Sequence, residues 1–211
     1  MPGNQIDLSQ LFGQVAQALA QNKSTLNQAD TYNQNHGDNM AEIFKLVTQA
    51  LEEKKDAKPA AQLKYAATQV RKIGSGSAQV YAKGLARAAK DIKGNAIDTS
   101  NVMQLVLDLI AGGKKVNPSP QAGDPLSDIL GGLMGAGKQA SGGDDKLDAS
   151  DLLTAGLAFL SAKQGGDDTL GAAVRALVAE SPLSQAPHRE QSGQLVLDTL
   201  LKTIGSMAQR K

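Results

Sequence analysis

Apolar residues recur along most of the chain at the spacing of one helix face. The first stripe joins Leu8, Leu11, Val15 and Leu19, which lie three or four residues apart, and this period is typical of an amphipathic α-helix. Similar stripes predict further helices at residues 39–55, 59–74, 78–93, 102–110, 125–138, 153–160, 168–180 and 195–207. No segment alternates with the period of two that a half-buried strand requires. The pattern therefore predicts an all-α protein.

Short connections separate most of these segments, and their residue types are those that begin or end helices. Pro59 suits the first position of a helix, and Gly74 suits the residue just after one. Helices of this length joined by short loops pack antiparallel to their neighbours. We expect about eight antiparallel helices in a closed barrel or bundle, and the pattern leaves open which of the two forms. Residues 1–211 are expected to form a single domain.

The longest polar interruption covers residues 22–39 and is rich in Asn and Gln. We interpret it as a loop, with the next helix beginning near Asn39, and loops of that length are often functional. Residues 33–40 read Asn-Gln-Asn-His-Gly-Asp-Asn-Met. A helix start with free backbone N–H groups is a natural site for phosphate. The alternative is a polar loop that ends at an ordinary helix cap, Asp38 or Asn39.

Composition narrows the possible functions mainly by exclusion. The 211 residues carry a formal net charge of +1, which gives no electrostatic reason to expect nucleic acid or an anionic membrane as a partner. There is no cysteine, so disulfides and thiolate metal sites are excluded. No apolar run is long enough to span a bilayer, and the first residues lack the pattern of a signal peptide. We therefore expect a cytoplasmic protein.

Three other short segments combine small or polar residues with a predicted helix start. Residues 74–77 read Gly-Ser-Gly-Ser and could cradle a phosphate, although a helix end followed by a helix cap needs the same residue types. Gly123 and Asp124 precede the predicted helix at 125–138, where Asp124 could simply be the cap. Residues 188–193 read His-Arg-Glu-Gln-Ser-Gly, and the alternative there is a solvent-exposed histidine.

Taken together and in this order, the four segments resemble the L subunit of dihydroxyacetone kinase, which binds ADP or ATP. That family has a loop of the form Asp-x-Asp-His-Gly-x-Asn-Met, matched here by residues 33–40, and an upstream Asp, matched by Gln28. Its Gly-Gly-x-Ser-Gly-x-Leu-Tyr-Gly stretch is matched by residues 74–82. Its Pro-Gly-Asp loop is matched by residues 122–124, and its His-x-Asp-Pro-Gly segment by residues 188–193. The resemblance covers nearly the whole chain.

The resemblance implies a barrel of eight antiparallel α-helices, with a nucleotide bound across the loops at one end. It implies that ATP is held with two magnesium ions. Phosphate would then pass to dihydroxyacetone on a separate K subunit, or a phosphotransfer partner would rephosphorylate ADP. At the nucleotide it places His36, Asn39, Met40, Gly74, Ser75, Gly76, Ser77, Gly123 and Asp124.

The chain departs from the family where the metal should bind. Amides replace the family's three metal-binding aspartates at Gln28, Asn33 and Asn35. An amide keeps a carbonyl oxygen but lacks the charge that Mg²⁺ favours. Pro125 replaces the lysine usual after Gly-Asp, and the family's Gly-Arg-Ala-Ser stretch has no counterpart. Asp30 and Asp38 offer substitute carboxylates, but at a different spacing.

Three functional hypotheses follow from these matches and departures. The favoured one is a degenerate member of the family that binds a nucleotide or phosphate ligand without normal Mg-dependent phosphotransfer. In it, Mg²⁺ binds weakly or not at all, and no catalytic residue is assigned. The second is an active kinase subunit with altered metal ligands, working with a K-type partner. The third is a helical interaction protein for which the family match is coincidence.

Overall fold

The computed structural model describes residues 5–92, 96–98, 101–112, 178 and 181–209. Within these ranges the chain forms seven α-helices, one 3-10 helix and no strand. The all-α prediction is therefore confirmed for this part of the protein. The predicted helices at 125–138 and 153–160 lie outside the described residues, as does all of 168–180 except Val178.

The first helix, α1 (Leu8–Gln21), follows the predicted apolar stripe. Asp7 precedes it, and its carboxylate accepts a hydrogen bond of 3.1 Å from the backbone N–H of Gln10. This bond satisfies one of the N–H groups that a helix start leaves without a partner inside the helix. The stripe of α1 is buried along its whole length, through Leu8, Leu11, Phe12, Val15 and Leu19.

The polar segment at residues 22–39 is not one long loop, and that prediction was wrong. It contains a short helix, α2 (Lys23–Ala29), and the first turn of α3 (His36–Glu53), which begins before Asn39. Leu26 is the one buried residue of α2, so this helix has no apolar stripe that a periodicity argument could detect. The true connection between the two helices is residues 30–35.

The next three helices are α4 (Pro59–Arg71), α5 (Gly76–Asp91) and α6 (Val102–Ile110). Pro59 occupies the start of α4, and Gly74, with φ of 77°, lies in the turn beyond its end, as predicted. α5 begins at Gly76 rather than at Ala78, because the Ser75 hydroxyl accepts a hydrogen bond of 3.2 Å from the backbone N–H of Ala78.

The chain ends in the 3-10 helix η1 (Pro182–Gln185) and the long helix α10 (Pro187–Gln209). The last helix therefore begins earlier than its apolar stripe predicted. His188 and the residues after it, which the sequence placed in or beside a loop, form the first turns of α10 instead. A proline is tolerated at the first helical position, so Pro187 begins this helix rather than preventing it.

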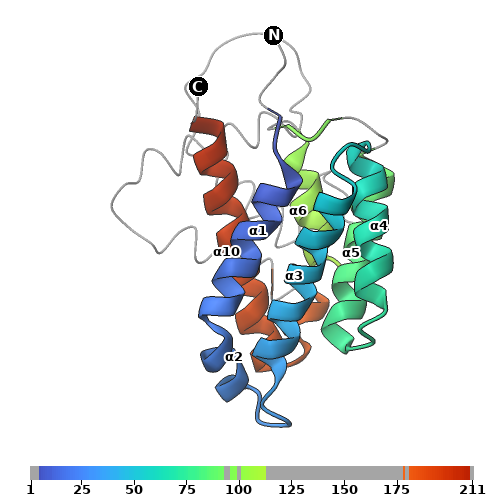
Figure 1. The fold of residues 1–211 in the computed structure, drawn as a ribbon. Coiled ribbons are helices and arrows are strands. Elements are labelled where there is room, and N and C mark those ends of the chain that lie inside the picture. Colours follow the sequence, from blue (N-terminus) through green and yellow to red (C-terminus); the bar gives the residue numbers. More distant parts are fainter. Residues whose placement is uncertain (1–4, 93–95, 99–100, 113–177, 179–180, 210–211) are drawn as a thin grey trace, which may run out of the picture.

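Figure 1 shows the main helices side by side, with neighbours running in opposite directions. α3 packs between α1 and α4, α5 packs on α4 and α6, and the last helix, α10, returns to lie against the first, α1. The helices share one apolar core. Its largest fully buried side chains include Phe12, Phe44, Tyr81, Leu19 and Leu51.

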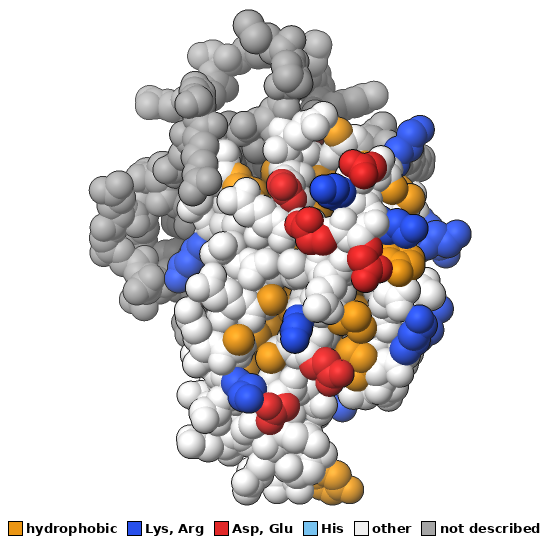
Figure 2. Space-filling model, in the orientation of Figure 1, with side chains coloured by type: hydrophobic (Ala, Val, Ile, Leu, Met, Phe, Trp, Pro, Cys, Tyr) orange, Lys and Arg blue, Asp and Glu red, His pale blue; other side chains and the backbone are white. Residues whose placement is uncertain are grey.

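The surface carries charges of both signs. On the face shown in Figure 2, acidic and basic side chains are interspersed rather than gathered in areas of one sign. In the described part of the chain, no helix is both long enough and apolar enough to cross a membrane.

Candidate functional site

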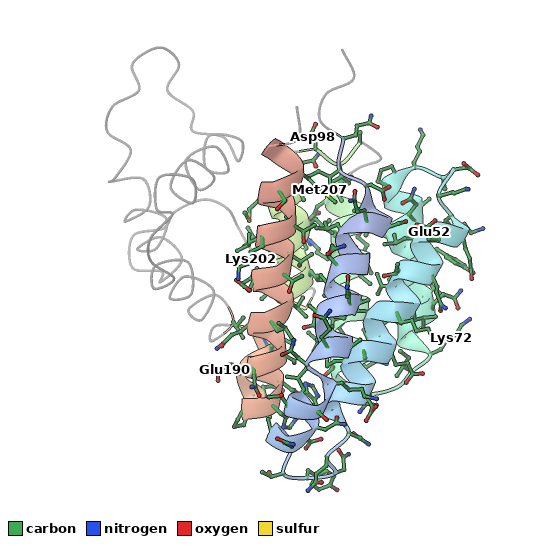
Figure 3. All side chains as sticks on the ribbon, turned by 60° about the vertical axis from the view of Figure 1, so that its left-hand side comes forward. Glu52, Lys72, Asp98, Glu190, Lys202 and Met207 are labelled. Atoms are coloured by element: carbon green, nitrogen blue, oxygen red, sulfur yellow. The ribbon has the colours of Figure 1, made fainter. Side chains whose placement is uncertain are left out.

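Three helices begin at the same end of the molecule, and their first turns hold most of the candidate residues. α3, α5 and α10 all start at the lower end in Figure 1. In Figure 3, Glu190 near the start of α10 and Lys72 just before α5 lie low in the view, whereas Asp98 and Met207 lie high. Side-chain contacts join α10 to each of the other two starts, through His36 of α3 and Gly76 of α5. Three of the four loops singled out by sequence therefore meet, and the fourth, at Gly123 and Asp124, lies outside the described residues.

The start of α3 is capped from outside the helix. The Asn27 side chain, on α2, accepts hydrogen bonds from the backbone N–H groups of Gly37 at 2.7 Å and Asp38 at 3.2 Å. Its amide nitrogen donates to the Asp38 carboxylate at 2.7 Å. Sequence reasoning expected Asp38 or Asn39 to be the cap, and that was wrong because the capping group comes from another helix. Two donors that could have bound phosphate at α3 are thus already occupied.

Gly37 is needed at this point for close packing rather than for a turn. A Cβ atom built on Gly37 would collide with the backbone carbonyl oxygen of Lys23. Lys23 also forms an ion pair of 2.9 Å with Asp38. The pKa of Asp38 is lowered by its hydrogen bonds to Lys23 and Asn27. Asp38 is therefore engaged within the protein, which weakens its case as a substitute metal ligand.

His36 joins the start of α3 to the start of α10. Its Nε2 lies 2.8 Å from the hydroxyl of Ser192, and that hydroxyl donates at 2.9 Å to the carbonyl oxygen of Arg189. Because the hydroxyl proton is used on Arg189, His36 is the donor, which assigns the proton of the neutral imidazole to Nε2. Burial, together with the nearby His188, lowers the pKa of His36 to about 4. His36 is therefore neutral at physiological pH and serves as a buried link between two helices.

His188 lies between His36 and a buried carboxylate. The two imidazole rings have centroids 4.6 Å apart at a tilt of 60°. On its other side, Nδ1 of His188 is 3.8 Å from Asp30, whose side chain is 5% exposed. Burial alone would raise the pKa of Asp30, but the backbone N–H of Tyr32 and the charge of His188 hold it below its usual value. Asp30 is thus a buried anion that His188 and neighbouring backbone N–H groups already stabilise.

The side chain of Arg189 contacts the first residue of α5. A Cβ atom built on Gly76 would be 2.6 Å from Nη2 of Arg189, so the guanidinium group rests directly on the first residue of α5. The next residue, Ser77, is buried with 4% of its surface exposed. Four residues on, Tyr81 is fully buried and forms a T-shaped pair with Phe44, with ring centroids 4.9 Å apart. Among the residues that the structure describes, its hydroxyl has no hydrogen-bond partner, and burial raises its pKa.

The three positions that the family uses for metal are exposed amides here. Gln28, Asn33 and Asn35 all face solvent. The Asn35 side-chain oxygen accepts a hydrogen bond of 2.9 Å from the side chain of Asn39, and the Asn33 oxygen accepts one of 3.4 Å from the backbone of Asn35. Over the residues that the structure describes, no cluster of three His, Asp or Glu side chains could hold a metal ion.

The remaining candidates divide between core and loop. Met40 is fully buried in the core beneath the site, and Asn39 is half-buried in the first turns of α3. Gly74 and Ser75 form the turn that leads into α5, and the Ser75 hydroxyl is used as the helix cap. These residues therefore have structural roles in the core, in α3 and in the turn before α5.

Sequence reasoning missed the residues that connect the helices. It singled out residues 188–193 but assigned no role to Arg189 or Ser192, and it passed over Asn27 within the polar stretch. Arg189 and Ser192 are three residues apart, a spacing that puts two side chains on one face once the segment is known to be helical. No feature of the sequence indicated that Asn27 caps a different helix.

The chain was compared with models of known protein families, with curated proteins and with solved structures, and nothing matches it in any of the three comparisons. The resemblance to the dihydroxyacetone kinase L subunit accordingly rests on the quoted motifs alone.

Proposed function

We propose that this protein is a degenerate relative of the dihydroxyacetone kinase L subunit that binds ADP, ATP or another phosphate ligand and does not carry out normal Mg-dependent phosphotransfer. The proposal includes the family's closed barrel of eight helices, of which the described residues would form the larger part. It also includes a cytoplasmic location.

The convergence of three helix starts carries the proposal. α3, α5 and α10 direct the positive ends of their dipoles toward one end of the molecule. A helix start offers unpaired N–H groups and a partial positive charge, which together favour a phosphate group. The start of α3 is occupied by Asn27, so the start of α5 at Gly76 and Ser77 is the better place for the ligand.

The amides at Gln28, Asn33 and Asn35 support the absence of phosphotransfer. Mg²⁺ loses its water reluctantly and is normally held by carboxylates together with the phosphates. Of the two substitute carboxylates, Asp38 is paired with Lys23, and Asp30 bonds the Tyr32 amide beside His188. Without a metal, little neutralises the charge that develops on a transferred phosphoryl group.

Calorimetry with ADP and ATP, each in EDTA and in excess Mg²⁺, tests the proposal. We expect binding in EDTA that Mg²⁺ does not strengthen. Binding that requires Mg²⁺ would instead support an active kinase subunit, and addition of a K-type partner with dihydroxyacetone would then test for turnover. If neither nucleotide binds under either condition, the proposed function is wrong and the chain is better regarded as a helical interaction protein.

A further inference from the structure

The positive charge of Arg189 has no ion-pair partner among the described acidic side chains. Its guanidinium group rests on Gly76, and no carboxylate in the described part of the chain forms an ion pair with it. The buried acid Asp30 is directed at Nδ1 of His188 and at the Tyr32 amide. A half-buried arginine normally has an anionic or hydrogen-bonding partner, because its five N–H donors are costly to leave unpaired.

Within the described part of the chain, donors in the first turn of α5 are also unpaired. Ser75 uses its hydroxyl on the N–H of Ala78 and its carbonyl on the N–H of Gln79. The N–H groups of Gly76 and Ser77 are therefore among those that a helix start leaves without an internal partner. The Ser77 hydroxyl is in the same turn, belongs to a residue only 4% exposed, and has no hydrogen-bond partner among the residues described.

This turn is accessible from solvent, because Gly76 itself is exposed. The three atoms nearest to a Cβ built on Gly76 all belong to the guanidinium of Arg189, which is the far end of a flexible side chain. The group can therefore swing aside and close again over a small anion. His36, which faces the same region from α3, carries no charge at neutral pH and does not oppose Arg189.

We propose that Arg189 does here what a metal ion does in related sites, and that it holds a metal-free phosphate group against the first turn of α5. The inference rests on the proposed function and adds to it the form of the ligand: free ADP or another uncomplexed phosphate rather than its magnesium complex. A guanidinium matches two phosphate oxygens at once and stays charged at all physiological pH values. It supplies positive charge without the carboxylates that Mg²⁺ would need, which is consistent with amides at the family's metal positions.

The test compares the affinity for ADP in EDTA among three full-length proteins: the unmodified chain, Arg189→Gln and Arg71→Gln. Arg71 closes α4 at the same end of the molecule and is exposed, so its variant loses the same charge without touching Gly76. A charge-assisted bond is worth enough that we expect Arg189→Gln to weaken binding at least tenfold. Arg71→Gln should change it less than threefold.

A second pair of variants covers the case in which Arg189→Gln perturbs folding. Arg189→Lys keeps the charge and should retain more affinity than Arg189→Gln. Gly76→Val puts a branched side chain where the guanidinium lies, and it should abolish ADP binding while the helical circular dichroism stays unchanged.

Each outcome separates this inference from the proposed function. Equal weakening in Arg189→Gln and Arg71→Gln would show general charge attraction and overturn the role of Arg189, although the protein would still bind ADP. Tighter binding when Mg²⁺ replaces EDTA would overturn the preference for a metal-free phosphate. Failure of the unmodified chain to bind ADP or inorganic phosphate in EDTA would overturn this inference, and lack of ADP and ATP binding in Mg²⁺ as well would overturn the proposed function.

Discussion

At the scale of single residues, His36 makes the stability of the protein depend on pH. Its pKa is lowered to about 4 in the folded state, against about 6.5 in an unfolded chain. Between these values the unfolded state binds a proton that the folded state does not, so the free energy of unfolding falls as pH falls from about 6.5 to 4. The pKa shift corresponds to about 3 kcal/mol of the free energy of unfolding. This contribution is complete above pH 6.5 and is lost as pH falls to 4.

We expect the variant His36→Gln to lose this dependence. The difference in free energy of unfolding between the unmodified protein and the variant should shrink by about 3 kcal/mol from pH 7 to pH 4. Urea denaturation at several pH values measures it. The two proteins must be compared because a second group titrates in the same pH range. Burial raises the pKa of Asp108 to about 6, so this residue increases the free energy of unfolding of both proteins as pH falls. A difference that stays constant with pH would mean that His36 is not buried as a neutral group.

Replacement by alanine should have opposite effects on stability at two glycines, Gly37 and Gly13. Gly37→Ala forces a Cβ atom onto the Lys23 carbonyl, and backbone cannot easily move away, so we expect a loss of about 1–3 kcal/mol. Gly13→Ala, in the middle of α1, meets only Thr48 at an ordinary 3.8 Å, and there the gain in helix propensity should stabilise by about 0.5–1 kcal/mol. Thermal denaturation of both variants checks the signs. Equal effects would show that α2 and α3 are less closely packed than described.

At the scale of elements, the end of α2 and the connection to α3 carry the three amides to which we attribute the loss of the metal. We expect Gln28→Asp, Asn33→Asp and Asn35→Asp together to raise the affinity for ADP in Mg²⁺ at least about tenfold. Two opposite unit charges about 4 Å apart attract by roughly 4 kcal/mol at an effective dielectric of 20, and solvent exposure of all three positions reduces this. In EDTA, the added negative charge should weaken ADP binding instead. Magnesium titration with ADP present measures both effects.

A control for this change places the same three charges elsewhere. The control protein carries Gln14→Glu, Gln17→Glu and Gln21→Glu together, at three exposed positions of α1. This protein should bind ADP with no gain from Mg²⁺. If the unmodified protein already binds ADP in the micromolar range in Mg²⁺ and much more weakly in EDTA, amide oxygens or Asp30 suffice for the metal, and the degenerate interpretation is wrong.

At the scale of the whole molecule, the first and last helices pack together and should make the described helices unfold as one unit. Leu200 of α10 is 1% exposed, and its neighbour Leu201 is only partly buried. Leu200→Ala should cost about 2–5 kcal/mol because it leaves a cavity, and Leu201→Ala about 1 kcal/mol or less. Hydrogen exchange should show the Leu200→Ala loss in α1 and α4 as well as in α10. A loss confined to α10 would mean that this helix unfolds separately.

The sequence by itself determined the helical nature of the chain. The spacing of Leu8, Leu11, Val15 and Leu19 requires only local geometry, as does the stop at Gly74, and both are found as predicted. The short α2 escaped this reasoning because a single buried leucine gives no period. The start of α10 escaped it because its apolar stripe begins well after Pro187.

Only the tertiary structure decided which groups of the helix starts already have partners within the protein. Asn27 is close to Gly37 because α2 folds back on α3, and Arg189 reaches Gly76 because α10 returns from the end of the chain to the start of α5. Hydrogen bonds and charges act over a few ångströms, whereas these partners are 10 and 113 residues apart in the sequence. A pattern along the chain carries local preferences for helix and turn. It carries no distances between helices, and those distances put Asn27 on the first turn of α3 and Arg189 on the first turn of α5.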